Sequence, residues 1–114
     1  MDRTITERLL DAIDALDRID HYTSGVTRAE FETQRDVQLI VERLAITIGE
    51  ALDRARNIDQ TMEAKIPGMG HTIAVGRHIL HTTSGIDPAM IWEIVVDKGP
   101  RLREPLRLAI EDYC

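Results

Sequence analysis

Apolar residues recur every three or four positions along most of this chain, which is the spacing of one face of an α-helix. The first such stripe follows Thr4-Ile5-Thr6-Glu7, a capping-box pattern, and ends near Thr23-Ser24-Gly25. The longest stripe covers residues 34–56, about six helical turns. We find no convincing strand, which would alternate between apolar and polar residues. The pattern therefore predicts an all-α protein.

A second capping-box pattern, Thr27-Arg28-Ala29-Glu30, lies between these two helices and predicts a short helical turn that carries Phe31 into the core. Gly49 interrupts the long apolar stripe, where a glycine costs up to about 1 kcal/mol relative to alanine. We interpret Gly49 as a place where the missing side chain lets another helix come close.

Proline and glycine mark the remaining helix boundaries. Pro67-Gly68-Met69-Gly70 indicates a loop or a short helical turn over residues 57–70, and a further helix is expected over residues 71–83. Asp87-Pro88 is typical of a helix start, with aspartate as the N-cap and proline as the first helical residue. Lys98-Gly99-Pro100 is expected to end that helix.

Together these elements predict a single-domain antiparallel bundle of four to five helices over residues 1–114. Pro105 is expected early enough in the final short helix to be tolerated. A chain of 114 residues that is 43% hydrophobic and 30% charged suits one globular domain. No apolar run approaches the roughly 18 residues that a membrane span requires, and the N-terminus lacks a signal-peptide layout. We therefore expect a cytoplasmic protein, in which the lone Cys114 forms no intrachain disulfide.

The formal net charge of −6 argues against broad, sequence-independent binding to nucleic acid, because such binding depends on many Lys and Arg side chains. Any contact with RNA should therefore be local. A concentrated groove would need Arg77 with one or two further arginines from elsewhere in the chain or from a second copy. The candidates are Arg54, Arg56, Arg101 and Arg103.

Arg77 and His81 are the candidate catalytic residues. They are four positions apart, so on a helix both side chains leave the same face about 6 Å apart along the axis. Imidazole exchanges protons near neutral pH, and a guanidinium donates two parallel hydrogen bonds to phosphate oxygens. Such a pair could take the proton of a ribose 2′-OH and stabilise the charge that grows on the phosphate. On spacing alone, a solvated helix face is the commoner explanation for such a pair.

The other histidines do not indicate a metal site. His71 and His78 lie about 10 Å apart along a helix, too far to share one ion. Only His78 and His81 could chelate together, and no carboxylate nearby in sequence completes their ligand set. We therefore predict neither a metal nor a cofactor.

Two segments around the helix that carries His81 resemble one known family. They are Ile48-Gly49-Glu50-Ala51 and Trp92-Glu93-Ile94-Val95, about forty residues apart, with Gly85-Ile86-Asp87 between them. On these motifs the chain resembles the HepT-like members of the HEPN family. The resemblance implies a helical homodimer in which the Arg and His of each copy line a shared cleft and cut RNA without a metal. It also implies a partner, a minimal nucleotidyltransferase, that silences this toxin by attaching AMP to a tyrosine.

The chain departs from the family motif, which is Arg, four to six residues, His, one residue and Tyr. His81 matches the histidine, but five places before it stands Gly76, and Arg77 occupies the place of an Asn that often follows the Arg. Thr83 stands at the tyrosine position and lacks a phenol, so inhibition by adenylylation there should be impossible. Glu50 and His78 are the predicted supporting residues, Glu50 by orienting Arg77 or His81.

Two interpretations follow. In the first, the chain is a metal-independent endoribonuclease toxin that is restrained by complex formation with the nucleotidyltransferase. In the second, it is a catalytically decayed module that docks a nucleotidyltransferase or a nucleotide. A homodimer is expected in either case, because Leu39 and Ile46 lie beside the main apolar face of the long helix. The alternative is that these two residues pack under the final helix of the same chain.

Overall fold

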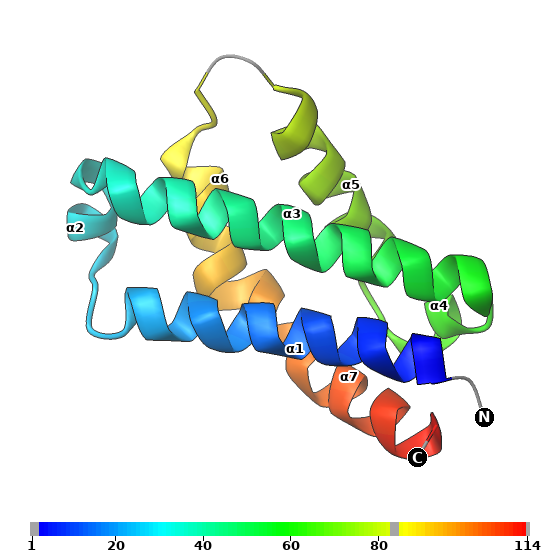
Figure 1. Ribbon diagram of the computed structural model, residues 1–114. Coiled ribbons are helices and arrows are strands. Elements are labelled where there is room, and N and C mark those ends of the chain that lie inside the picture. Colours follow the sequence, from blue (N-terminus) through cyan, green and yellow to red (C-terminus); the bar gives the residue numbers. More distant parts are fainter. Residues whose placement is uncertain (1–2, 83–84, 114) are drawn as a thin grey trace.

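The computed structural model describes residues 3–82 and 85–113, and every regular element within those residues is helical (Figure 1). The all-α prediction is confirmed, although the chain forms more helical segments than the four to five expected. The elements in order are α1 (Arg3–Thr23), α2 (Arg28–Thr33), α3 (Arg35–Ile58), α4 (Met62–Lys65), α5 (Met69–His81), α6 (Pro88–Glu93), the π-helical turn η1 (Ile94–Lys98) and α7 (Gly99–Tyr113).

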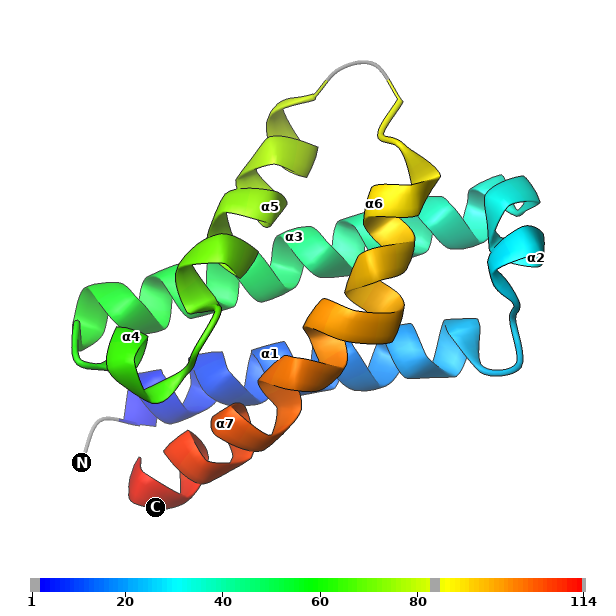
Figure 2. The ribbon, with the colours of Figure 1, turned by 180° about the vertical axis from the view of Figure 1, so that it is seen from behind.

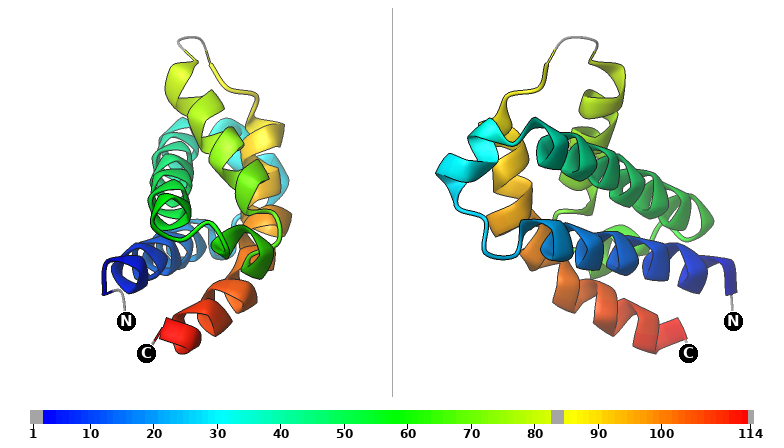
Figure 3. Two further views of the ribbon diagram at one scale, coloured as in Figure 1. Left: turned by 90° about the vertical axis from the view of Figure 1, so that its right-hand side faces the viewer. Right: turned by 60° about the vertical axis from the view of Figure 1, so that its left-hand side comes forward.

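The two long helices α1 and α3 lie side by side and antiparallel, and together they form one layer (Figure 1). Helices α5, α6 and α7 form a second layer that lies across this pair (Figure 2). The end-on view in Figure 3 shows the two layers edge-on, with α5 against α3 and α7 against α1. The middle of α5, at Thr72, Ile73 and Gly76, comes closest to the middle of α3.

One hydrophobic core joins both layers. Fully buried side chains come from α1, α2, α3, α6 and α7, as Leu9, Phe31, Leu52, Ile91 and Leu106 illustrate. Burial of this continuous set is the main favourable contribution to folding. None of the described helices is both long enough and apolar enough to span a bilayer.

The predicted capping box at the start of α2 is confirmed. Thr27 Oγ1 accepts a hydrogen bond from the Glu30 N–H at 3.2 Å, and Glu30 Oε1 accepts one from the Thr27 N–H at 3.0 Å. Phe31 follows and is completely buried against Trp92, with their ring centroids 5.1 Å apart. Asp87 likewise caps α6 by accepting a hydrogen bond from the Ala89 N–H at 3.0 Å.

Two predicted boundaries were wrong. Lys98-Gly99-Pro100 does not end the helix, because α6 continues through the π turn η1 into α7, which also places Pro105 inside α7 instead of near its start. The Gly99 N–H bonds to the Ile94 carbonyl, five residues back. A Cβ at Gly99 would lie 2.6 Å from that carbonyl oxygen, so the absence of a side chain is what lets the helix continue. At the N-terminus, α1 begins at Arg3, just before the predicted Thr4 cap.

Gly49 on α3 faces Gly76 on α5, which confirms that Gly49 allows another helix to come close. A Cβ built on Gly49 would lie 3.4 Å from Gly76 Cα, and one built on Gly76 would lie 3.2 Å from the backbone oxygen of Ala45. The neighbouring atoms belong to the backbone, so they cannot move aside as a flexible side chain would. This glycine contact sets the distance between α3 and α5.

Replacing Gly76 with valine is expected to push α5 away from α3. Overpacking of this kind costs about 1–3 kcal/mol, which for a domain of this size lowers Tm by several degrees. Thermal unfolding followed by circular dichroism measures the effect. Ala74→Val, at an exposed position of the same helix, is the matched control and should change stability by less than about 0.5 kcal/mol. Equal melting temperatures for the two variants would contradict the close contact.

The end of α7 is tied to the α3–α4 corner through Asp59. The Tyr113 hydroxyl donates to Asp59 Oδ2, and Thr61 donates to Asp59 Oδ1 from its hydroxyl at 2.6 Å and from its N–H at 2.9 Å. The Thr61 hydroxyl is the main cause that lowers the pKa of Asp59 to about 2, with Tyr113, the Thr61 N–H and the charge of Lys65 adding to it. The carboxylate form is therefore the one that holds the corner together.

This lowered pKa predicts an acid-labile contribution to stability. An aspartate in the unfolded chain titrates near about pH 4, so the contact stabilises the fold fully above that pH. Its contribution is lost as the pH falls from about 4 to about 2. Urea unfolding across this range should show a shallower loss of stability for Asp59→Asn than for the wild type. Asp112→Asn, at an exposed carboxylate on α7, should keep the wild-type slope.

Candidate functional site

A groove of about 170 Å³ lies between α3 and α5, beside the Gly49–Gly76 contact. The structure brings the two predicted catalytic residues, Arg77 and His81, and the predicted supporting residue Glu50 to this groove. Its full lining is Ile46, Gly49, Glu50, Asp53, Ile73, Gly76, Arg77, Leu80 and His81. One helix therefore supplies the basic groups, and the facing helix supplies the acidic ones.

Arg77 is held by a carboxylate that sequence reasoning missed. Its Nη2 lies 3.1 Å from Asp53 Oδ2, and the other oxygen of Asp53 lies 3.2 Å from Arg56 Nη2. Arg56 in turn contacts Glu63 at 3.2 Å. Among the described residues only Nη2 of Arg77 is engaged, so the other N–H groups of its half-exposed guanidinium can still donate to a phosphate. Asp53 lies three residues after Glu50 on α3, so helical spacing could have predicted that both carboxylates share one face.

His81 is the last residue of α5 and is exposed to solvent at one end of the groove. Within the part of the chain that the structure describes, its ring makes no hydrogen bond or ion pair. Both ring nitrogens are therefore available to a ligand. Since His81 follows Arg77 by one helical turn, the two side chains project from the same face of α5.

The predicted supporting residues and Thr83 differ in where they lie relative to the groove. Glu50 is exposed on the α3 side of the groove. His78 is exposed on α5 but does not line the groove, and its backbone carbonyl accepts a hydrogen bond from the Thr82 hydroxyl at 2.6 Å. Thr83 lies outside the described residues. Among those that are described, no group of three His, Cys, Asp or Glu side chains is arranged to hold a metal ion.

Gly76, five residues before His81, is buried in the contact between α3 and α5. A Cβ there would already press on the Ala45 carbonyl, so this position has no room for an arginine side chain. The guanidinium that reaches the groove comes instead from the next residue, Arg77. The position five residues before His81 is therefore part of the contact between α3 and α5.

The charge of the groove does not by itself favour a polyanion. Two carboxylates, Glu50 and Asp53, face one guanidinium, so the groove carries a net charge of −1 while His81 is neutral. The other arginines considered from the sequence do not line it. Arg56 is paired with Asp53 and Glu63, and Arg103 bridges α7 to Asp17 and Asp20 on α1 at 2.6 and 2.7 Å.

The apolar residues expected at a dimer contact are divided between the interior and the surface. Ile46 is only 8% exposed and packs beneath α5, where a Cβ on Gly76 would lie 3.6 Å from its Cα. It is thus covered within the chain by α5, not by the final helix. Leu39 and Leu80 remain about half exposed, at 47% and 50%.

Comparison with known proteins gives two matches. A family model described as "Ribonuclease HepT-like" matches residues 12–108. A protein of Methanocaldococcus jannaschii named "Putative RNase MJ1380" is 27% identical over 108 residues, which cover 93% of this chain and 96% of that protein. No solved structure matches the chain.

Proposed function

The chain belongs to the HepT-like ribonuclease family, and we propose that it is a metal-independent endoribonuclease whose groove between α3 and α5 holds the scissile phosphate. The observation that carries this proposal is that Arg77 and His81 line one groove from a single helix, one turn apart. The relative from M. jannaschii, whose name also describes an RNase, supports the same class of substrate.

In the proposed reaction, the His81 imidazole takes the proton of a ribose 2′-OH, and the 2′ oxygen forms a bond to the adjacent phosphorus. The bond between that phosphorus and the 5′ oxygen of the next nucleotide breaks, and the leaving oxygen takes a proton from the imidazolium. The free N–H groups of Arg77 stabilise the negative charge that builds on the phosphate oxygens. The products are a 2′,3′-cyclic phosphate and a 5′-hydroxyl, and the step consumes no other reactant.

Asp53 acts in this proposal as a positioning residue. Its ion pair with Arg77, supported by Arg56 behind it, fixes the direction of the guanidinium at the groove. Glu50 lies on the same wall and could orient His81 when substrate is bound. Neither carboxylate contacts the phosphate in this proposal, because both would repel it.

Exposed apolar residues beside the groove support a homodimer. Two copies related by a two-fold axis would bring a second Arg77 and His81 to a shared cleft, together with a second Glu50 and Asp53. The exposed Leu39 and Leu80 on α3 and α5 offer apolar surface for such a contact. Light scattering at micromolar concentration tests this, and a clean monomer that still cleaves RNA would contradict the shared cleft.

We extend the proposal, on the family resemblance, to a toxin that pairs with a minimal nucleotidyltransferase. Thr83 stands at the position of the modified tyrosine, so restraint would act through complex formation. The alternative, a decayed module that docks a nucleotidyltransferase or a nucleotide, is favoured by the ion pair that already engages Arg77. Bacterial growth during expression separates the two. The toxin should arrest growth in a way that His81→Ala relieves, whereas equal harmlessness of both would favour the module.

The direct test of the nuclease is cleavage of a 5′-labelled RNA by purified protein in the presence of excess EDTA. We expect cleavage to persist, and the 5′ fragments to carry a 2′,3′-cyclic phosphate. A substrate with a single 2′-deoxy substitution at the cut site should resist at that site, because the attacking hydroxyl is missing. Products ending in a 5′-phosphate, or activity abolished by EDTA, would contradict the proposed chemistry.

A further inference from the structure

A second cavity, of about 440 Å³, lies at the start of α5 where it faces η1 and α7. It shares no lining residue with the groove that holds Arg77 and His81. Basic side chains from two elements meet here, His71 from α5 and Lys98 from η1, with Arg101 of α7 beside them. The remaining lining residues are Pro67, Gly68, Thr72, Asp97, Leu102 and Pro105.

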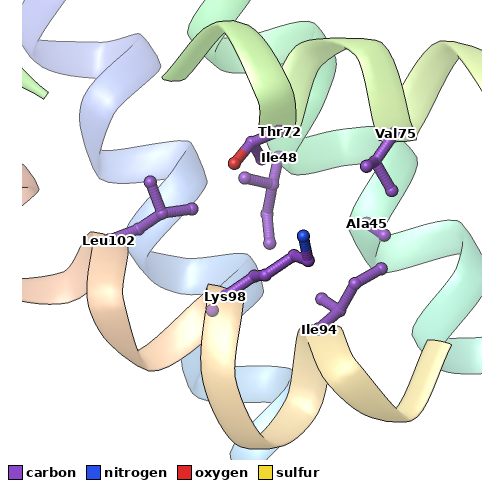
Figure 4. Close-up of a pocket in the computed structure, with 8 residues that line it drawn as sticks. Ala45, Ile48, Thr72, Val75, Ile94, Lys98 and Leu102 are labelled. Atoms are coloured by element: carbon purple, nitrogen blue, oxygen red, sulfur yellow. The ribbon is translucent and has the colours of Figure 1, made fainter. Parts of the chain in front are cut away.

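Lys98 reaches this cavity across an apolar surface. Figure 4 shows its side chain extending from η1 toward α5, between Ile94 and Leu102 and beneath Ile48. The aliphatic part covers the apolar wall, and the ammonium is carried to the rim. Lys98 Nζ ends 2.6 Å from His71 Nε2.

The charge of Lys98 has no acidic partner among the described residues. Arg43 and Arg54 also lack one there, but both are exposed, whereas Lys98 is partly buried. Its contact with His71 is exposed to solvent, so a ligand can reach the ammonium. An anion in the cavity would supply the charge partner that the described residues lack.

His71 adds a further hydrogen-bond donor to the cavity, and this set of donors indicates an anionic ligand. The Lys98 ammonium donates, so His71 Nε2 accepts, and the Nδ1–H of the His71 ring can then donate a hydrogen bond to a ligand oxygen. Arg101 engages Asp97 through Nε at 2.7 Å and keeps its other N–H groups for a ligand. Lys98 and Arg101 against Asp97 leave a net charge of +1, in a chain whose overall charge is −6.

We propose that this cavity binds the phosphate group of a nucleotide-sized phosphate ester, with Lys98 as the main charge partner and His71 and Arg101 as further donors. Phosphate suits the site because it offers several oxygens to the donors that line the same cavity. The volume is within the range of pockets that hold small ligands, and Leu102 with the two prolines supplies an apolar wall for a sugar or base. The phosphate could belong to a free nucleotide or to an RNA strand that continues beyond the groove.

Backbone amide NMR of the full chain tests the proposal at constant ionic strength. Three probes are titrated separately: inorganic phosphate, uridine 5′-monophosphate, and a short 2′-O-methyl oligoribonucleotide that the proposed reaction cannot cleave. Saturable shifts are expected at His71, Lys98 and their neighbours with at least one probe. Tightest binding by the mononucleotide would assign the site to a free nucleotide, and tightest binding by the oligonucleotide would assign it to RNA.

Lys98→Gln should weaken this binding about tenfold or more, the usual effect of losing one charge-assisted hydrogen bond. Arg43→Gln removes an exposed charge outside the cavity and should leave the affinity unchanged. His81→Ala should also leave the affinity for inorganic phosphate and for the mononucleotide unchanged, which separates this site from the proposed nuclease. The absence of saturable shifts with all three probes, or equal affinity of wild type and Lys98→Gln, would overturn the proposal. Unchanged amide spectra away from the cavity verify that the variants fold.

Discussion

His81→Ala is expected to lower the rate of RNA cleavage by about 10²–10⁴-fold, the usual contribution of a general acid–base group. The physical reason is that no other imidazole among the described residues lines the groove to take the place of His81. Single-turnover cleavage of a labelled RNA measures the change. Because His81 is exposed at the end of α5, the variant should fold and melt like the wild type.

His21→Ala is the matched control for this variant. It removes an exposed imidazole from α1, where the ring contacts Tyr22 and does not line the groove. Its cleavage rate should stay within about twofold of the wild type, since substitutions away from a site rarely affect it. If His21→Ala and His81→Ala retained the same activity, His81 would have no catalytic role.

Arg77→Ala is expected to lower kcat by about 10²–10³-fold, the typical cost of losing a donor that stabilises transition-state charge. Arg77→Lys should recover only part of the loss, because an ammonium cannot form the parallel pair of hydrogen bonds of a guanidinium. Arg77→Ala, unlike Arg77→Lys, also removes the positive charge that faces Glu50 and Asp53 in the groove. The loss should therefore be larger at low ionic strength than at high ionic strength.

Arg43→Ala provides the control for Arg77. Arg43 is an exposed arginine of α3 that lacks a described acidic partner and does not line the groove. If its removal slowed cleavage as much as Arg77→Ala does, the effect would reflect the general charge of the chain and not a contact with the scissile phosphate.

Asp53→Asn distinguishes two effects of Asp53, the orientation of Arg77 and the negative charge that it adds to the groove. It keeps the size of the side chain but weakens its hold on Arg77, and it raises the charge of the groove. A positioning role predicts a lower kcat with a lower KM, since RNA binds more readily while the guanidinium is less well directed. Higher kcat with unchanged KM would mean that Asp53 only inhibits.

Local rules were sufficient for most of the fold. The capping box at Thr27 and the Asp87-Pro88 start depend on residues within one helical turn, so they could be predicted from neighbours alone. The packing role of Gly49 could be predicted, because a glycine inside a long helix destabilises it unless another helix packs closely there. Its partner, Gly76, could not be identified, because that pairing depends on how α5 crosses α3.

The junction of α6 and α7 shows where local rules failed. Gly99-Pro100 ordinarily ends a helix, but a π turn absorbs the mismatch, because the Gly99 N–H reaches back to the Ile94 carbonyl. Tertiary packing of η1 on α7 and α1 stabilises this unusual turn. The same turn directs Lys98 toward α5, so the cavity beside His71 could not be predicted from the sequence either.

The residues of the groove were partly accessible from helical spacing. Arg77 and His81 share a face because they are one turn apart, which holds for any regular helix. Their proximity to Glu50 and Asp53 depends on the long-range contact between α3 and α5. The ion pair between Arg77 and Asp53 therefore became apparent only in three dimensions.

The central claim is that Arg77 and His81 act on one phosphate in one groove, and the cleavage rate of the double variant Arg77→Ala/His81→Ala tests it most directly. Groups that serve the same transition state are strongly non-additive. We therefore predict that the double variant cleaves RNA about as slowly as the worse single variant. Losses that multiply independently, or a double variant with wild-type activity, would contradict a shared site.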